Sequence, residues 1–154
     1  MIPKLAKVLV VTDFTADAGH SLPFAYAIAE PGGEVVLMHV IEHQDNPNPL
    51  YAHYSEDDLS NPDRRRKAVA EVEERLRGMI PKGSQEKSVT TTVAAVVHPA
   101  VVDGILQEAR ERKADAIVIG SHGGSGLAQL LMGSVAEAVT RHSEVPVLIV
   151  PHKG

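Results

Sequence analysis

Five short apolar runs rich in valine and isoleucine recur along the chain, and they constrain its fold more than any other feature. They cover residues 7–12, 34–41, 88–97, 114–119 and 145–150. Each run is continuously apolar rather than alternating, as expected of strands that are covered on both faces. Segments with helical spacing separate them, at about 17–29, 63–79, 100–112 and 134–142. This alternation predicts an α/β domain built on a parallel sheet with right-handed crossovers.

Proline and glycine positions agree with most of these boundaries. The segments PGG (31–33) and PKG (81–83) follow the first two predicted helices. Pro99 is expected to open the third helix, where its missing N–H costs nothing. Pro23 conflicts with the first helix, because a proline inside a helix removes a hydrogen bond. We therefore expect that helix to begin late, near residues 19–22.

Composition and charge exclude several classes of function. With 154 residues, 44% of them hydrophobic, the chain is expected to form one domain over residues 1–154. Its formal net charge of -5 argues against nucleic acid or an anionic membrane as partners. The chain has no cysteine, which excludes disulfides and thiol chemistry. No segment reaches the roughly 18 apolar residues of a membrane span, so we expect a soluble, cytoplasmic protein.

Residues 43–62 form a polar, proline-containing segment between the second strand and the second helix. They are expected to form a long loop, either a plain surface insertion or a functional excursion. The four cations that follow, Arg64 to Lys67, are most simply a solvated first helical turn, although they would also suit an anionic ligand.

The segment GSHGGSGLAQLLMGS, residues 120–134, follows the fourth run and holds five of the twelve glycines. In an open parallel sheet, such a loop can aim backbone N–H groups and a helix N-terminus at an anion. Three known motifs do not fit it. A Walker A loop needs a lysine between Gly133 and Ser134, the dinucleotide fingerprint belongs after the first strand, and a nucleophile elbow around Ser125 needs glycine at Leu127.

The spacing that does fit is G-x2-G-x9-G-[ST], formed by Gly120, Gly123, Gly133 and Ser134. It resembles the nucleotide-binding motif of the universal stress protein family. The resemblance extends over nearly the whole chain, through VTDFT after the first run, LMHV in the second, ADAIVIGSHG in the fourth and GSVAEAVTRHSEVPVLIV at the end.

The family resemblance implies a Rossmann-like fold, an open doubly wound five-stranded parallel sheet of order 3-2-1-4-5 with helices on both faces. It places the nucleotide site between the first and fourth strands. Members with the glycine motif bind ATP, so the resemblance implies an ATP-binding protein of the stress response. Carried over by position, the residues expected at the nucleotide are Thr12, Asp13, Val40, Gly120, His122, Gly123, Gly133, Ser134 and Val135.

The residues themselves limit the chemistry of this site. Between Gly120 and Thr140 there is no Lys or Arg. Phosphate charge would therefore be met by amides, the Ser134 hydroxyl, a helix end and Mg²⁺. Fast phosphoryl transfer usually adds a cationic clamp and a base, so binding is better supported than turnover and no catalytic residue is assigned.

The histidines include no recognisable metal site. There are eight of them, but no H-x3-H or H-E-x-x-H pattern links them, so no metal ligands are assigned among the protein's side chains. Two residues depart from the family pattern. His98 stands where relatives commonly have glycine and is expected at the crevice edge, where it would contact or obstruct a ligand, and Gly124 replaces a frequent basic residue.

Three functions remain open from the sequence. The first is an ATP-binding sensor or regulator in the stress response that acts through an unidentified protein partner. The second is a slow ATPase or adenylyl-transferring enzyme, and the third is a nucleotide-free interaction module. The family also pairs its last strand between subunits, and an apolar edge at 145–150 would aggregate if left bare, so we expect a homodimer through this strand.

Overall fold

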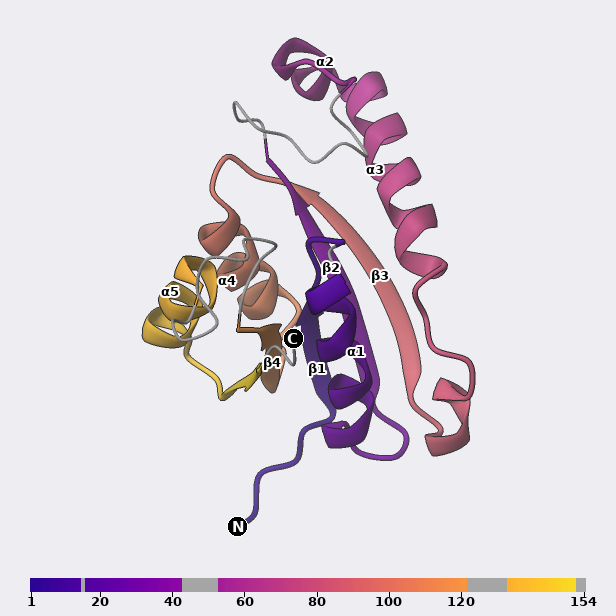
Figure 1. Ribbon diagram of the computed structural model, residues 1–154, viewed down its shortest axis with the longest axis vertical. Coiled ribbons are helices and arrows are strands. Elements are labelled where there is room, and N and C mark those ends of the chain that lie inside the picture. Colours follow the sequence, from indigo (N-terminus) through magenta and orange to yellow (C-terminus); the bar gives the residue numbers. More distant parts are fainter. Residues whose placement is uncertain (15, 43–52, 122–132, 152–154) are drawn as a thin grey trace.

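The computed structural model describes the chain apart from residues 15, 43–52, 122–132 and 152–154 (Figure 1). The five strands are β1 (Lys7–Val11), β2 (Glu34–Ile41), β3 (Thr90–Val97), β4 (Ala116–Gly120) and β5 (Val147–Val150). The helices are α1 (Ala16–Ile28), α2 (Glu56–Ser60), α3 (Pro62–Arg77), α4 (Val101–Glu111) and α5 (Ser134–His142), with a short 3-10 helix at Ser84–Lys87.

All five strands are parallel and lie in the order β3-β2-β1-β4-β5, so the expected doubly wound sheet is confirmed. The chain runs outward from β1 through β2 to β3, returns across β1 to β4, and ends at β5. The order therefore reverses between β1 and β4. In open sheets of this kind, that reversal opens a crevice beyond the carboxyl ends of the strands.

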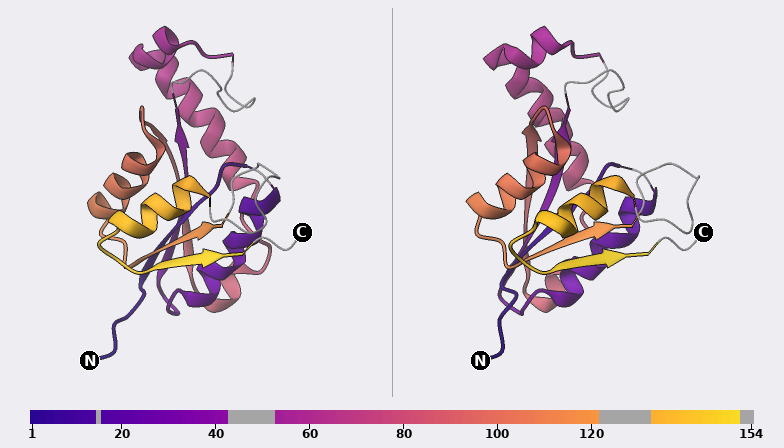
Figure 2. Two further views of the ribbon diagram at one scale, coloured as in Figure 1. Left: turned by 60° about the vertical axis from the view of Figure 1, so that its left-hand side comes forward. Right: turned by 90° about the vertical axis from the view of Figure 1, so that its left-hand side faces the viewer.

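Two apolar layers enclose the sheet, because successive side chains of a strand point to opposite faces. In β1, Val8 and Val10 pack with α1 and α3 on one face, while Leu9 and Val11 pack with α4 and α5 on the other. Figures 1 and 2 show the two helix pairs on the two sides of the sheet. Burial on both faces explains why the strand sequences are apolar without alternation.

Several expected boundaries differ from those of the structure, the fourth strand among them, which covers Ala116–Gly120. The strand predicted from residue 88 begins at Thr90, because Ser88 has a left-handed φ of 59° that a strand does not accommodate. Pro99 does not open α4, which starts at Val101 with Ala100 as its N-cap. The fifth strand begins at Val147 rather than 145.

The first helix does not begin late, as Pro23 suggested. It starts at Ala16 and includes Pro23 in its interior. Leu22, Ala25, Tyr26 and Ala29 are all buried in the core, while Pro23 is exposed. Packing of this apolar face outweighs the single hydrogen bond that the proline removes.

The described part of the polar segment, from His53 onward, is not a plain loop. It contains α2, which begins with a reciprocal capping box between Ser55 and Asp58. Tyr54 and Leu59 are buried in the core cluster under α1 and α3. Arg64 to Lys67 are exposed at the start of α3, as expected of a solvated turn.

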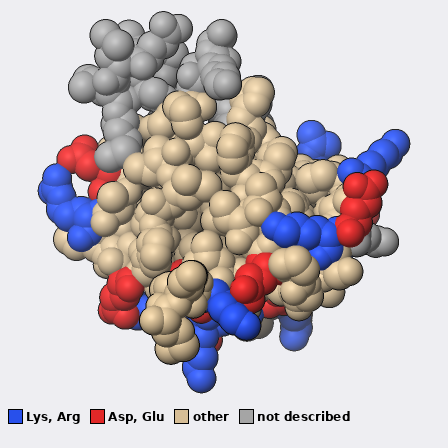
Figure 3. All heavy atoms as spheres, turned by 90° about the horizontal axis from the view of Figure 1, so that it is seen from below, with Lys and Arg blue, Asp and Glu red and all other residues tan. Residues whose placement is uncertain are grey.

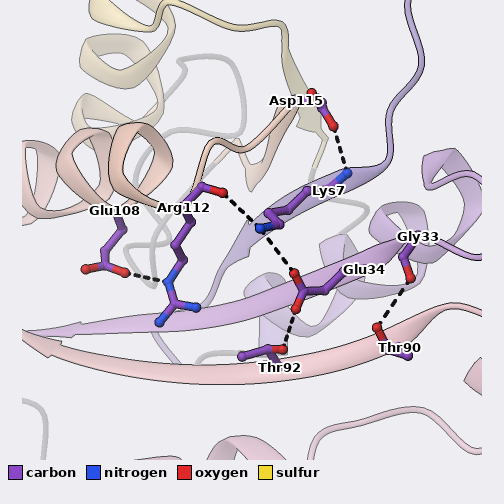
Figure 4. A network of polar contacts seen from close by, with 8 residues as sticks. All are labelled: Lys7, Gly33, Glu34, Thr90, Thr92, Glu108, Arg112 and Asp115. Atoms are coloured by element: carbon purple, nitrogen blue, oxygen red, sulfur yellow. Dashed lines mark hydrogen bonds and ion pairs between the residues drawn. The ribbon is translucent and has the colours of Figure 1, made fainter.

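A polar network holds the amino ends of the strands (Figure 4). Lys7 of β1 donates its backbone N–H to Asp115 and its ammonium to the carbonyl of Arg112, and its ammonium lies 3.5 Å from the Glu34 carboxylate of β2. Thr92 of β3 donates its hydroxyl to the same carboxylate at 2.6 Å. The network ties three strands and the α4–β4 turn together at the end of the sheet opposite the crevice.

Candidate functional site

A cavity of about 300 Å³ lies at the carboxyl ends of β1, β2 and β4, beside the start of α5. This is the place where the strand order reverses. Seven of the residues expected from the sequence line it: Thr12, Asp13, Val40, Gly120, Gly133, Ser134 and Val135. The other two, His122 and Gly123, lie outside the described residues, as does Gly124.

Thr12 shapes the turn that follows β1. Its backbone N–H donates to the carbonyl of Met38 on β2, and its Oγ1 accepts the N–H of Phe14 at 3.0 Å. Phe14 has a left-handed φ of 67°, an unusual conformation for a bulky side chain. The Thr12 hydroxyl is thus engaged in holding the turn, which places the half-buried Asp13 at the cavity.

His39 of β2 holds the same turn from the other side. Its Nδ1 lies 2.7 Å from the carbonyl oxygen of Thr12. Because a carbonyl can only accept, Nδ1 carries the proton and donates it. The His39 ring also lies 4.7 Å from the ring of Phe14.

The pKa of His39 is lowered from its ordinary value of 6.5. Burial is the main cause, because it penalises the charged imidazolium, while the Thr12 carbonyl and the negative charge of Asp13 oppose the shift. His39 is therefore neutral at pH 7 and acts as a hydrogen-bond donor that fixes the turn.

The two ends of the glycine segment meet at the cavity. Ser121 donates its N–H to the carbonyl of Val150, and its own carbonyl accepts the N–H of Gly133. Gly133 is the N-cap of α5 and makes no side-chain capping bond. The first N–H groups of a helix have no intrahelical acceptor, so the amides that follow Gly133 suit an anion at this end of the cavity.

The opposite end of the cavity lies against α4 and includes apolar side chains. Val40 of β2 and Val101 of α4 both line it. Helix α4 approaches β2 closely at Gly104, where an added Cβ would meet Val40 methyl carbons at 3.2 and 3.3 Å. This close approach sets the distance between Val101, one turn earlier, and the strand.

Sequence reasoning did not assign half of the fourteen described lining residues, among them Glu42 and Val101. Glu42 comes directly after β2, and only the position at which that strand ends places it at the cavity. The described wall contains two carboxylates, from Asp13 and Glu42, and neither Lys nor Arg. An anionic ligand would therefore depend on backbone amides and a counter-ion rather than on basic side chains.

His98 does not line the described part of the cavity wall. Its Nδ1 accepts the N–H of Ala100 at 3.0 Å, and its backbone N–H donates to Ile41. The Nδ1 atom is used in the β3–α4 turn, and the expected effect of His98 on a ligand stays a prediction.

The described residues contain neither a metal-binding cluster nor a membrane-spanning helix. No group of three or more His, Cys, Asp or Glu side chains among them is arranged to hold a metal ion. None of the helices in the described part of the chain has both the length and the apolarity to cross a bilayer.

The sheet order and the cavity at its reversal define a doubly wound α/β domain of the kind that has its ligand crevice at the switch point. Comparison with known proteins makes this assignment specific. The sequence model described as universal stress protein family matches residues 4–151. Universal stress protein MJ0577 of Methanocaldococcus jannaschii is 30% identical, over 96% of this chain and 96% of that protein.

Solved structures agree with the family match. The MJ0577 structure is similar with a TM-score of 0.76 and 27% identity, covering 99% of each chain. A crystal structure of a universal stress protein in complex with cAMP has a TM-score of 0.62 and 26% identity, covering 98% of this chain and 100% of that one. The chain belongs to the universal stress protein family, as the glycine spacing indicated.

Proposed function

We propose that this protein binds ATP together with Mg²⁺ in the cavity at the β1–β4 switch point, and that it acts in the stress response as a nucleotide-dependent regulator of a partner protein. The observation that carries the proposal is the convergence of Asp13, Val40, Gly133 and Ser134 on one cavity from three separate parts of the chain. The related universal stress protein solved with cAMP supports an adenine nucleotide as the ligand.

The two ends of the cavity match the two ends of a nucleotide. Val40 and Val101 offer apolar surface to the base, and the uncapped start of α5 at Gly133 offers amides to the phosphates. Asp13, between them at the end of β1, is suited to accept a ribose hydroxyl. Its carboxylate and the Ser134 hydroxyl are oxygen ligands of the type Mg²⁺ prefers, with phosphate and water completing the coordination.

The protein is proposed to bind the nucleotide without turning it over rapidly. The described wall supplies no Lys or Arg, and the sequence from Gly120 to Thr140 contains none. Charge that develops during phosphoryl transfer would meet no cationic side chain from these regions. We expect the partner protein to distinguish the nucleotide-bound from the nucleotide-free protein, rather than to respond to a reaction product.

We further propose a homodimer that pairs β5 with its counterpart. Strand β5 forms the edge of the sheet beside β4, and Figure 2 shows it in yellow next to β4. The face seen from below in Figure 3 has a broad area without charged side chains, with Lys, Arg, Asp and Glu around its rim. The sequence of β5, VLIV, contains no charged residue, and an apolar edge strand of this kind would recruit another strand if it were left open.

Isothermal titration calorimetry with ATP in the presence of Mg²⁺ tests the binding proposal. The wild type should show saturable binding at one site, and Gly133→Val should weaken it at least about tenfold, because the new side chain stands where phosphate would approach the helix start. Gly133 has a φ of -60° and a ψ of 150°, which valine adopts readily, so the change tests space rather than strain.

The matched control is Gly78→Val, at the exposed C-cap of α3, which should bind ATP like the wild type. Absence of saturable binding by the wild type would overturn the proposed function. Equal affinity in Gly133→Val would place the nucleotide elsewhere on the molecule.

A further inference from the structure

The carboxylate of Glu42 has no assigned role, although it lines the cavity. Glu42 follows directly after β2, and Val40 lies two residues before it. Because side chains of a strand alternate, Val40 and Glu42 fall on the same side as Met38, which packs toward α4 and α5. No described residue forms a hydrogen bond or ion pair with the Glu42 carboxylate.

The geometry of the sheet places Glu42 at the end of the cavity away from the phosphates. The start of α5 follows β4, and β1 lies between β4 and β2. Neighbouring strands are about 4.8 Å apart, so the ends of β4 and β2 are separated by roughly 10 Å. That separation suits a mononucleotide with its phosphates at Gly133 and its base beside Val40.

The chemistry of a carboxylate restricts which base edge it can face. An ionised carboxylate only accepts hydrogen bonds. The exocyclic amine of adenine donates, whereas the 6-oxo group of hypoxanthine or guanine accepts and would be repelled. In a partly desolvated site, leaving a polar group without a hydrogen-bond partner costs free energy. A ligand that lacks the matching donor therefore binds more weakly than one that has it.

We propose that Glu42 is a specificity-determining residue that accepts a hydrogen bond from the exocyclic amine of the base and so selects adenine. The inference rests on the proposed function, because it needs a nucleotide in this cavity with its base toward β2. It goes further by assigning the choice of base to one side chain.

The test compares ATP with purine riboside triphosphate, which has hydrogen in place of the 6-amino group and is otherwise identical. Binding of each is measured by calorimetry with Mg²⁺ for the wild type, Glu42→Ala and Glu42→Gln. The wild type should prefer ATP about tenfold, and Glu42→Ala should reduce the preference to about twofold or less. Glu42→Gln keeps a neutral acceptor of the same reach, so its preference should fall between those two values.

Glu144→Ala is the matched control, because Glu144 is an exposed carboxylate before β5, at the amino end of the strands. It should keep the wild-type preference. Inosine triphosphate tests the opposite case, a base whose 6-oxo group accepts hydrogen bonds. It should bind the wild type more weakly than ATP, and its affinity should increase in Glu42→Ala. Circular dichroism should show that each variant is folded.

The outcomes separate this inference from the proposed function. If the wild type binds ATP and Glu42→Ala keeps the full preference, or if inosine triphosphate binds the wild type more tightly than ATP, the role of Glu42 is wrong while nucleotide binding stands. If the wild type binds neither triphosphate, the proposed function fails and the role of Glu42 fails with it.

Discussion

At the scale of single residues, His39 links the stability of the fold to the shape of the cavity. Its Nδ1–H donates to the Thr12 carbonyl, and Thr12 in turn accepts the N–H of Phe14 through its hydroxyl. The two hydrogen bonds hold Phe14 in its left-handed conformation. The position of Asp13 at the cavity therefore depends on a buried, neutral imidazole.

This arrangement predicts a pH dependence of stability. Burial lowers the pKa of native His39 below its ordinary value of 6.5, so below that pH the unfolded chain binds a proton that the native protein does not. The free energy of unfolding should therefore fall as the pH falls through this window, until the native imidazole also becomes protonated. Urea unfolding at about pH 7.5 and about pH 5.5 measures the change.

The variant His39→Asn tests which group is responsible. An asparagine amide can still donate to the Thr12 carbonyl but does not titrate. We expect His39→Asn to be less stable by about 1 kcal/mol at the higher pH and to lose stability less steeply on acidification. The exposed His20→Asn should keep the wild-type slope. An unchanged slope in His39→Asn would contradict the assignment.

Asp13, Gly133 and Ser134 were placed at the site through the resemblance to the universal stress protein family, whose motifs they match by position. The structure brings all three to one cavity. Glu42 was missed although the end of β2 was predicted correctly, because the close approach of α4 to β2 that encloses the cavity is a tertiary feature. The hydrogen bond that the His98 ring accepts from the Ala100 N–H is a turn contact that spacing does not reveal.

At the scale of elements, β5 is both the last strand of the sheet and its open edge. The carbonyls of Pro146 and Val150 accept hydrogen bonds from the N–H groups of Ile117 in β4 and of Ser121, which follows β4. The alternation of a parallel ladder then turns the N–H and C=O groups of Val147 and Ile149 toward the free edge. These groups are available to a second copy of the strand.

We therefore predict that Ile149→Pro dissociates the proposed dimer. Proline removes an outward N–H without removing a bond to β4, so the sheet within one subunit should persist. Analytical ultracentrifugation should give the wild type twice the 16.5 kDa mass of the chain, and the variant a single chain mass. A monomeric wild type, or a variant that remains dimeric while folded, would contradict pairing through this edge.

The elements also show where sequence patterns fail. Strand β2 and helix α5 begin and end as predicted, because apolar periodicity and flanking punctuation agree there. Helix α2 was missed because its five residues are too few for a periodic signal, and only its capping box marks it. Helix α1 was misjudged because Pro23 is a local signal, whereas the burial of the opposite helical face is tertiary.

At the scale of the whole molecule, the two ends of the sheet have different properties. The amino ends are tied by the network around Lys7, Glu34 and Asp115. The carboxyl ends enclose the cavity, where the turn held by His39 and Thr12, the start of α5 and two carboxylates meet. A parallel sheet brings all amino ends of its strands together at one edge and all carboxyl ends at the other. The fold therefore places the hydrogen-bonded network at one edge, the bonded end of the sheet, and the cavity at the other.

The most direct test of the central claim is a titration of the isotope-labelled protein with ATP and Mg²⁺, followed by amide chemical shifts in NMR spectra. The account predicts saturable shifts at the amides of Asp13, Val40, Ser134 and Val135. The amides of Lys7 and Asp115, at the bonded end of the sheet, should stay unchanged. Saturable shifts confined to other surfaces, or no shifts at an excess of nucleotide, would contradict a nucleotide site at the β1–β4 switch point.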